Sequence, residues 1–201
     1  LIYIRVTRHP MTTYMLRHNR RWTEKWGKEE RDTQIFYEAR SENADLVKLP
    51  FYVKDFETKF LKANSTDKTI FLFEEWIRKS DIFIDDIRKE TKAKIIEIPF
   101  EKFVFQPNEY VNKIALSLGV DPNKNTYKMM RKQKVPRSSL TDAPDNKIFR
   151  ELGWELPKKK KSLAEEFAEG RYFVKKETSP EALAVLDKLA TDYEERHNVN
   201  I

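Results

Sequence analysis

Only two segments of the 201-residue sequence carry the pattern of a β-strand, and this scarcity constrains the fold more than any other feature. In Leu1–Thr7, branched apolar residues alternate with tyrosine, arginine and threonine, and Ala93–Pro99 contains three isoleucines. Two strands cannot easily bury both faces of a parallel sheet by themselves. The chain is therefore expected to be mostly helical, or to need strands from outside this sequence. Because the sequence opens at Leu1 inside a strand pattern and without a methionine, we favour a fragment whose first strands precede it.

Helical patterns cover most of the remaining chain. Asn64–Asp67 has the residue types of a helix N-cap, Gly119 is placed as a helix stop, and Ser179 followed by Pro180 is typical of a helix start. Phe100–Phe105 is expected to be apolar and irregular. Helices are expected over Met11–Trp26, from about Lys68 to Thr91, from Pro107 to Gly119, over Asn125–Lys132, over Asp145–Leu152 and from Pro180 onward.

Length and composition limit the class of protein. The length predicts a single domain over residues 1–201, with Pro157–Ser162 as a possible linker. Cysteine is absent, which excludes disulfides, thiolate zinc sites and a cysteine nucleophile, and three scattered histidines disfavour a histidine-rich metal centre. No apolar run approaches the ~20 residues that span a bilayer. We therefore expect no membrane span and a cytoplasmic location; the oligomeric state is left open.

The positive charge is concentrated near the start of the chain. Residues 1–28 contain seven basic side chains and one acidic side chain, which accounts for the whole formal net charge of +6. A second basic cluster, formed by Lys124, Lys128, Arg131, Lys132, Lys134 and Arg137, has no acidic residue between Asp121 and Asp142. Clusters of positive charge attract anions, although a single run of charged residues more often forms a solvated face.

The first basic segment contains the pattern of an anion site. Arg8 follows the first strand, and Pro10 is placed to begin a helix. The N-terminus of a helix presents unpaired N–H groups and the positive end of the helix dipole, where anions bind. The guanidinium of Arg8 would add donors that fit a phosphate, and Thr12 and Thr13 could add hydroxyls. His9 is interpreted as a turn residue rather than a base.

Three segments together resemble the sulfotransferases that use 3′-phosphoadenylyl sulfate (PAPS). The first is similar to the family's strand and Arg-Asn-Pro-like turn, the second to its strand, Tyr-Glu-Asp-Leu-like turn and helix ending in Phe-Leu-Gly, and the third to its terminal helix. They are Ile2–Pro10, Lys94–Phe103 with Pro107 and Leu118-Gly119, and Ser179–Tyr193. The resemblance implies an α/β fold with a P-loop-NTPase-like parallel sheet, here helix-rich because the N-terminal strands are missing.

The resemblance also implies which residues bind the cofactor. Arg8 would bind the 3′-phosphate of PAPS and of its product, 3′-phosphoadenosine 5′-phosphate. The family has a serine eight residues later, where this chain has Leu16, so Thr12, Thr13 or Arg17 would replace it. Arg131 and Lys132 resemble the family's Met-Arg-Lys-Gly segment, which closes over the same phosphate, with Gln133 in place of the glycine. Lys134 and Arg137 would add to the charge of that segment.

The sequence leaves the function open between three classes. A sulfotransferase would transfer the sulfuryl group to an acceptor hydroxyl on a small molecule or carbohydrate, contacted by residues 29–66. The chain has no Gly-x-x-x-x-Gly-Lys motif for the 5′-phosphosulfate, so its catalytic residues are not assigned and it would form a half-site. The alternatives are a basic helical nucleic-acid-binding module, based on the arginines and aromatic residues between Met11 and Lys28, and a non-catalytic interaction protein.

Overall fold

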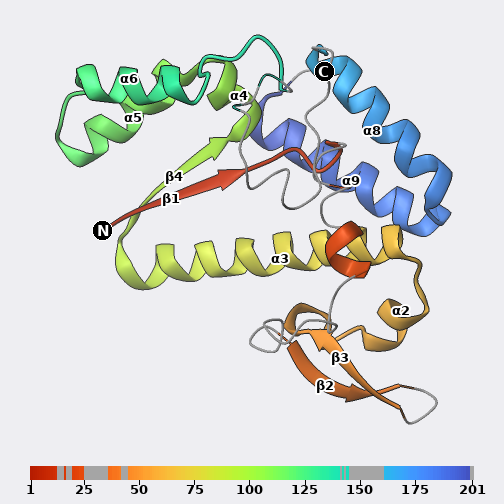
Figure 1. Ribbon diagram of the computed structural model, residues 1–201. Coiled ribbons are helices and arrows are strands. Elements are labelled where there is room, and N and C mark those ends of the chain that lie inside the picture. Colours follow the sequence, from red (N-terminus) through yellow and green to blue (C-terminus); the bar gives the residue numbers. More distant parts are fainter. Residues whose placement is uncertain are drawn as a thin grey trace. The chain divides into compact units, whose positions relative to one another are not determined.

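Figure 1 shows the computed structural model of the chain, which describes residues 1–12, 16, 20–24, 36–41, 45–140, 142, 144 and 161–199. The chain divides into two compact units. Unit 1 takes its described residues from Leu1–His9, Asp86–Glu166 and Glu194–Ile201, and unit 2 from Pro10–Asp85 and Phe167–Tyr193. The prediction of one domain over 1–201 stays a prediction. Of the possible linker at 157–162, only Lys161 and Ser162 are described.

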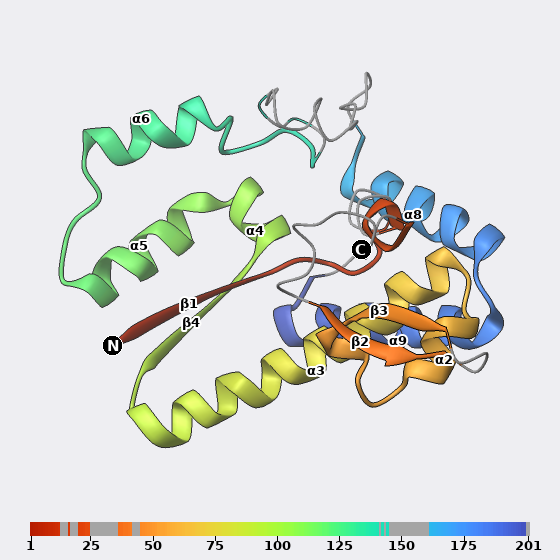
Figure 2. The same cartoon turned by 60° about the horizontal axis from the view of Figure 1, so that its bottom comes forward.

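Both strands expected from the sequence are present in unit 1, and they pair in parallel. β1 (Ile2–Thr7) lies beside β4 (Lys94–Pro99), with Ile2 opposite Lys94 and Thr7 opposite Pro99 (Figures 1 and 2). The structure is thus helix-rich with a two-stranded parallel sheet among its described residues. The P-loop-like sheet that the resemblance implies stays a prediction.

The sheet is covered mainly over β4. Ile96 and Ile98 pack with Tyr110 in the core of unit 1. Residues opposite each other in a parallel register share a face, yet Ile4 and Val6 of β1 remain 43% and 59% exposed. Exposed and less exposed side chains alternate over part of β1, but the branched apolar side chains of Ile4 and Val6 are on the exposed side and Arg5 is buried.

The helices that follow β4 begin and end as their sequences dictate, with one correction. Phe100–Phe105, which was expected to be irregular, forms the helix α4, because its two inward positions, Glu101 and Val104, are buried. α5 (Pro107–Leu118) ends as expected at Gly119, which has a φ of 67° that favours glycine. α6 (Lys124–Lys132) is confirmed, with Asn123 as its N-cap, and none of its residues is buried.

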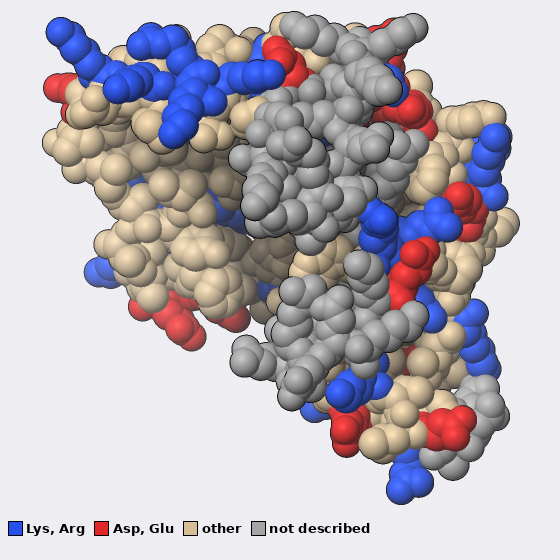
Figure 3. Space-filling model, viewed as in Figure 1, with Lys and Arg blue, Asp and Glu red and all other residues tan. Residues whose placement is uncertain are grey.

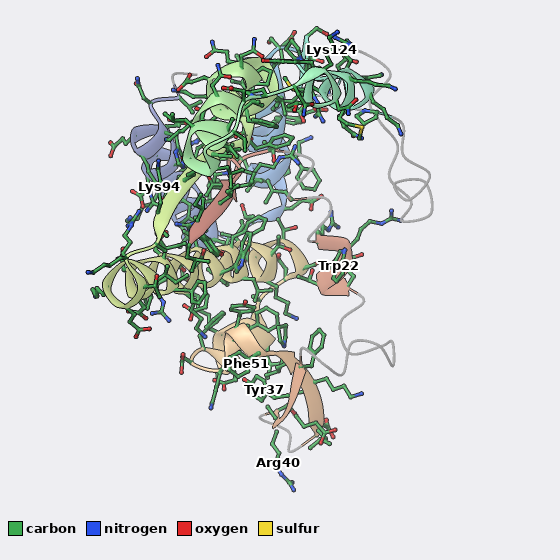
Figure 4. The ribbon with its side chains drawn as sticks, turned by 90° about the vertical axis from the view of Figure 1, so that its left-hand side faces the viewer. Trp22, Tyr37, Arg40, Phe51, Lys94 and Lys124 are labelled. Atoms are coloured by element: carbon green, nitrogen blue, oxygen red, sulfur yellow. The ribbon has the colours of Figure 1, made fainter. Side chains whose placement is uncertain are left out.

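Unit 2 contains a hairpin that the sequence did not predict. β2 (Phe36–Arg40) pairs antiparallel with β3 (Leu46–Pro50), followed by the 3-10 turn η2 (Phe51–Val53) and α2 (Glu57–Lys62). Leu49, Val53 and Phe60 form their core. In Figure 4, Tyr37 of β2 and Phe51 of η2 lie within this part of the unit, and Arg40 projects away from the hairpin. The Tyr37 hydroxyl donates a hydrogen bond to Glu57, 2.8 Å away.

Two long helices have the starts that the sequence indicated. α3 (Ser65–Thr91) is capped by the Asn64 side chain, which accepts from the N–H groups of Thr66 and Asp67 at 2.9 Å each. α9 (Pro180–His197) is capped by the Ser179 hydroxyl, which accepts from the Ala182 N–H. α8 (Leu163–Glu177) was not predicted. The side chain of Trp76 on α3 is 50% exposed. The helix expected at 145–152 lies outside the described residues.

Candidate anion-binding site

Arg8 lies in unit 1 directly after β1, where the sequence placed it. Its side chain is 21% exposed, and its guanidinium lies 4.7 Å from the centre of the Phe100 ring at the start of α4. The Arg8 Nε is 3.9 Å from Oε1 of Glu101, at the outer limit of an ion pair. The end of β1 and the start of α4 thus place Arg8 next to both an aromatic ring and a carboxylate.

Arg137 is the second cation of the site. It follows α6 in the chain, and its N–H donates a 2.7 Å hydrogen bond to the Val104 carbonyl at the end of α4. That contact places the Arg137 guanidinium 5.5 Å from the same Phe100 ring that Arg8 contacts. Two basic residues separated by about 130 positions in the chain therefore share one aromatic ring.

The electrostatics of Arg137 indicate a place for an anion. Burial lowers the pKa of Arg137, and the nearby positive charge of Arg8 lowers it further, while Asp142 acts in the opposite direction. Its described hydrogen bond runs to the Leu140 carbonyl, and its buried Nε has no hydrogen-bond partner in the described part of the chain. Because arginine keeps its charge in proteins, a half-buried guanidinium without a carboxylate contact is stabilised by binding an anion.

Glu101 and His9 form the buried side of the site. Both side chains are 1% exposed, and Glu101 accepts a 3.1 Å hydrogen bond from the backbone N–H of His9. The His9 ring contacts Glu194 at 3.0 Å, and burial lowers the pKa of His9, so the ring is neutral near pH 7. His9 follows β1 and belongs to no helix or strand, and its interpretation as a turn residue stays a prediction. The Glu101 carboxylate thus lies beside Arg8, and Asp142 is the acidic group that acts on Arg137.

The structure does not bring the rest of the basic segment to Arg8. Arg131 and Lys132 are exposed on the last turn of α6, and neither has a contact with Arg8 among the described residues. Lys134 is also exposed and lies 3.4 Å from Asp142. Figure 3 shows lysine and arginine side chains gathered over α6, and Figure 4 places Lys124 at the start of that helix. The second basic cluster thus divides into Arg137, which shares the Phe100 ring with Arg8, an exposed row on α6, and the exposed Lys134 that follows this helix.

The remaining predicted residues follow Arg8 in the chain. Thr12 belongs to unit 2, where its side chain is fully buried and its Oγ1 has no hydrogen-bond partner among the described residues. Thr13 and Arg17 lie outside the described residues, and Leu16 is buried in place of the family's serine. The assignment of Thr12, Thr13 and Arg17 to a phosphate therefore stays a prediction, as does that of Arg131 and Lys132.

Sequence reasoning did not assign a role to Phe100, the ring that both arginines contact. A signal was available, since Phe100 and Glu101 directly follow a strand that ends in proline. The contact from Glu194 to His9 crosses 185 positions, and no local pattern indicates it.

Among the described residues, no group of three histidine, aspartate or glutamate side chains could hold a metal ion. None of the described helices is long and apolar enough to cross a membrane. Comparisons with protein-family models, curated proteins and solved structures gave no match to this chain.

Proposed function

We propose that unit 1 binds the 3′-phosphate of PAPS and that the protein acts as a sulfotransferase. One observation carries the proposal: the guanidiniums of Arg8 and Arg137 both lie against the Phe100 ring, and the buried Nε of Arg137 lacks a hydrogen-bond partner in the described part of the chain. Two guanidiniums fit a phosphate dianion, because each can donate parallel hydrogen bonds to its oxygens. A bound anion is also favourable in charge, because burial and the positive charge of Arg8 disfavour the charged form of Arg137.

The two arginines have different parts in this proposal. Arg8 is the residue that the resemblance to PAPS-dependent sulfotransferases assigns to the 3′-phosphate, in a P-loop-like α/β fold. Arg137 comes from the basic segment that the same resemblance brings to that phosphate. Bound PAPS would supply the sulfuryl group, and the acceptor would be a hydroxyl of a small molecule or carbohydrate. The sequence has no Gly-x-x-x-x-Gly-Lys motif, so the residues of the transfer step are not assigned.

A binding experiment tests the proposal without requiring turnover. Isothermal titration of the 201-residue chain with 3′-phosphoadenosine 5′-phosphate and with 5′-AMP compares two ligands that differ in the 3′-phosphate. We expect at least tenfold tighter binding of the bisphosphate, because charged hydrogen bonds contribute about 1.5–3 kcal/mol each. Arg8→Gln and Arg137→Gln should each remove most of this preference, while Lys113→Gln, at an exposed position on α5, should keep it. Equal affinity of the unmodified chain for the two nucleotides would contradict the proposal.

Nucleic-acid binding remains a second candidate, because α6 exposes a row of cations beside an exposed aromatic residue. Lys124, Lys128, Arg131 and Lys132 are exposed on this helix together with Tyr127. Phosphates would contact the cations and a base could stack on the ring. Binding of mixed oligonucleotides that weakens steeply with salt, together with indifference to the mononucleotides, would favour this function instead.

A further inference from the structure

The two residues on either side of Arg8 are both held by one helical turn from the other end of the chain. Thr7 precedes Arg8, and its hydroxyl oxygen lies 3.1 Å from Nε2 of His197. His9 follows Arg8, and its Nε2 lies 3.0 Å from the Glu194 carboxylate, which accepts the hydrogen bond. Glu194 and His197 belong to the last turn of α9, and both residues lie within unit 1 together with Arg8.

These contacts fix the backbone that carries Arg8. Thr7 is the last residue of β1, so it is already paired with β4 on one side. His9 has a second restraint, because its backbone N–H donates to Glu101 while its ring contacts Glu194. Arg8 is therefore the central residue of a three-residue segment whose neighbours are both anchored, one of them fully buried. A guanidinium that binds an anion with directional hydrogen bonds depends on such fixed geometry.

We infer that Glu194 and His197 are positioning residues for Arg8, and that they link its affinity for a phosphate to the protonation of His9 and His197. The inference rests on the proposed function, since it concerns the same anion site. It adds residues that do not touch the ligand. These hydrogen bonds connect His197 to Thr7 and Glu194 to His9, the two neighbours of Arg8.

The charged groups around the two histidines determine the direction of the pH effect. His9 faces Glu194 of α9 and Glu101 of α4, and burial nevertheless lowers its pKa. Burial is also the largest cause of the lowered pKa of His197. Among the charged groups that face His197, Glu97 raises its pKa. The others, Arg196 on α9, Arg5 on β1 and Lys102 on α4, lower the pKa further.

Because both histidines have lowered pKa values, the anchored arrangement is the one with neutral rings. Protonation places a charge in a buried position, so the anchors are complete above the ordinary histidine pKa of about 6.5 and weaken as the pH falls below it. Affinity for the 3′-phosphate should decline in the same range. The ligand's own phosphate titrates near pH 6, so the comparison must be made between variants with the same ligand.

A pair of Thr7 variants tests the anchoring. Thr7→Val removes the hydroxyl and keeps the shape, whereas Thr7→Ser keeps the hydroxyl. At pH 8 we expect Thr7→Val to bind 3′-phosphoadenosine 5′-phosphate about fivefold more weakly than the unmodified chain, the effect of losing one hydrogen bond. Thr7→Ser should restore the affinity, and the affinity for 5′-AMP should change in neither variant. Equal losses for both nucleotides, or for Thr7→Val and Thr7→Ser alike, would show a general structural effect and overturn the inference.

A second pair, on α9, tests the link to protonation. Glu194→Gln keeps an oxygen that accepts from His9 but removes a charge that raises the pKa of His9. The affinity at pH 8 should stay within twofold, and the midpoint of its loss on acidification should move to lower pH. Glu195→Gln, at the exposed neighbouring position, should leave the midpoint unchanged. If the midpoint does not move in Glu194→Gln, the inference is wrong but the proposed function is not affected. If the unmodified chain does not prefer the bisphosphate, the proposed function is wrong and the inference fails with it.

Discussion

Replacing Arg137 by glutamine should remove the preference for the 3′-phosphate with little loss of stability, because the half-buried charge of Arg137 itself destabilises the fold. Burial and the neighbouring Arg8 both disfavour the charged form of Arg137, and no carboxylate lies within ion-pair distance of it among the described residues. The side chain gives up one 3.3 Å hydrogen bond to the Leu140 carbonyl and its contact with Phe100. The lost hydrogen bond contributes about 0.5–1.5 kcal/mol. Removing the half-buried positive charge that repels Arg8 offsets this loss.

The expected result is a chain that unfolds within about 2–4 °C of the unmodified protein, or above it, and has lost its 3′-phosphate preference. Arg8→Gln should behave differently, because it removes the guanidinium beside the buried Glu101 carboxylate. Loss of a contact to a charged group costs about 2 kcal/mol, which corresponds to a decrease of about 4–8 °C for a chain of this length. Differential scanning calorimetry without ligand, followed by titration with the bisphosphate, measures both quantities. A large loss of stability in Arg137→Gln with an unchanged nucleotide preference would refute this explanation.

Three further predictions concern stability. Asn64→Ala removes the cap that accepts from two N–H groups of α3, and thermal unfolding should show a loss of about 1 kcal/mol; no change would mean that water replaces the cap. Leu186→Ala creates a cavity at a fully buried position of α9 and should cost about 2–5 kcal/mol by urea unfolding, with a loss below 1 kcal/mol arguing against the packing described. Because the pKa values of His9 and His197 are lowered in the folded chain, the unfolding temperature should fall as the pH drops below about 6.5, and His197→Gln should reduce that slope. A slope unaffected by His197→Gln would show that another group titrates.

Local signals in the sequence predicted the parts of the fold that depend on local chemistry. The alternation in the first strand, the cap at Asn64, the glycine after α5 and the serine-proline start of α9 each act within a few residues. The hairpin β2–β3 was missed because its short strands mix charged and apolar residues without a strict alternation. α8 was missed because its buried face has few large apolar side chains, chiefly Phe167 and Val174.

The candidate site shows the same division between local and distant information. Arg8 could be singled out because a strand, an arginine and a proline stand in sequence. Arg137 could be placed only within a basic cluster, since nothing in the sequence shows that its backbone bonds to Val104 while Arg131 and Lys132 stay in solvent. The anchors at Glu194 and His197 depend on contacts across 185 and 190 positions, which one sequence does not reveal.

The central claim is that Arg8 and Arg137 bind one phosphate together over the Phe100 ring. A crystal structure of the chain with 3′-phosphoadenosine 5′-phosphate tests it most directly. We predict that the 3′-phosphate lies within hydrogen-bond distance of both guanidiniums, about 2.7–2.9 Å for charged pairs. A phosphate bound to the exposed lysines of α6, with Arg8 and Arg137 both unliganded, would contradict the claim.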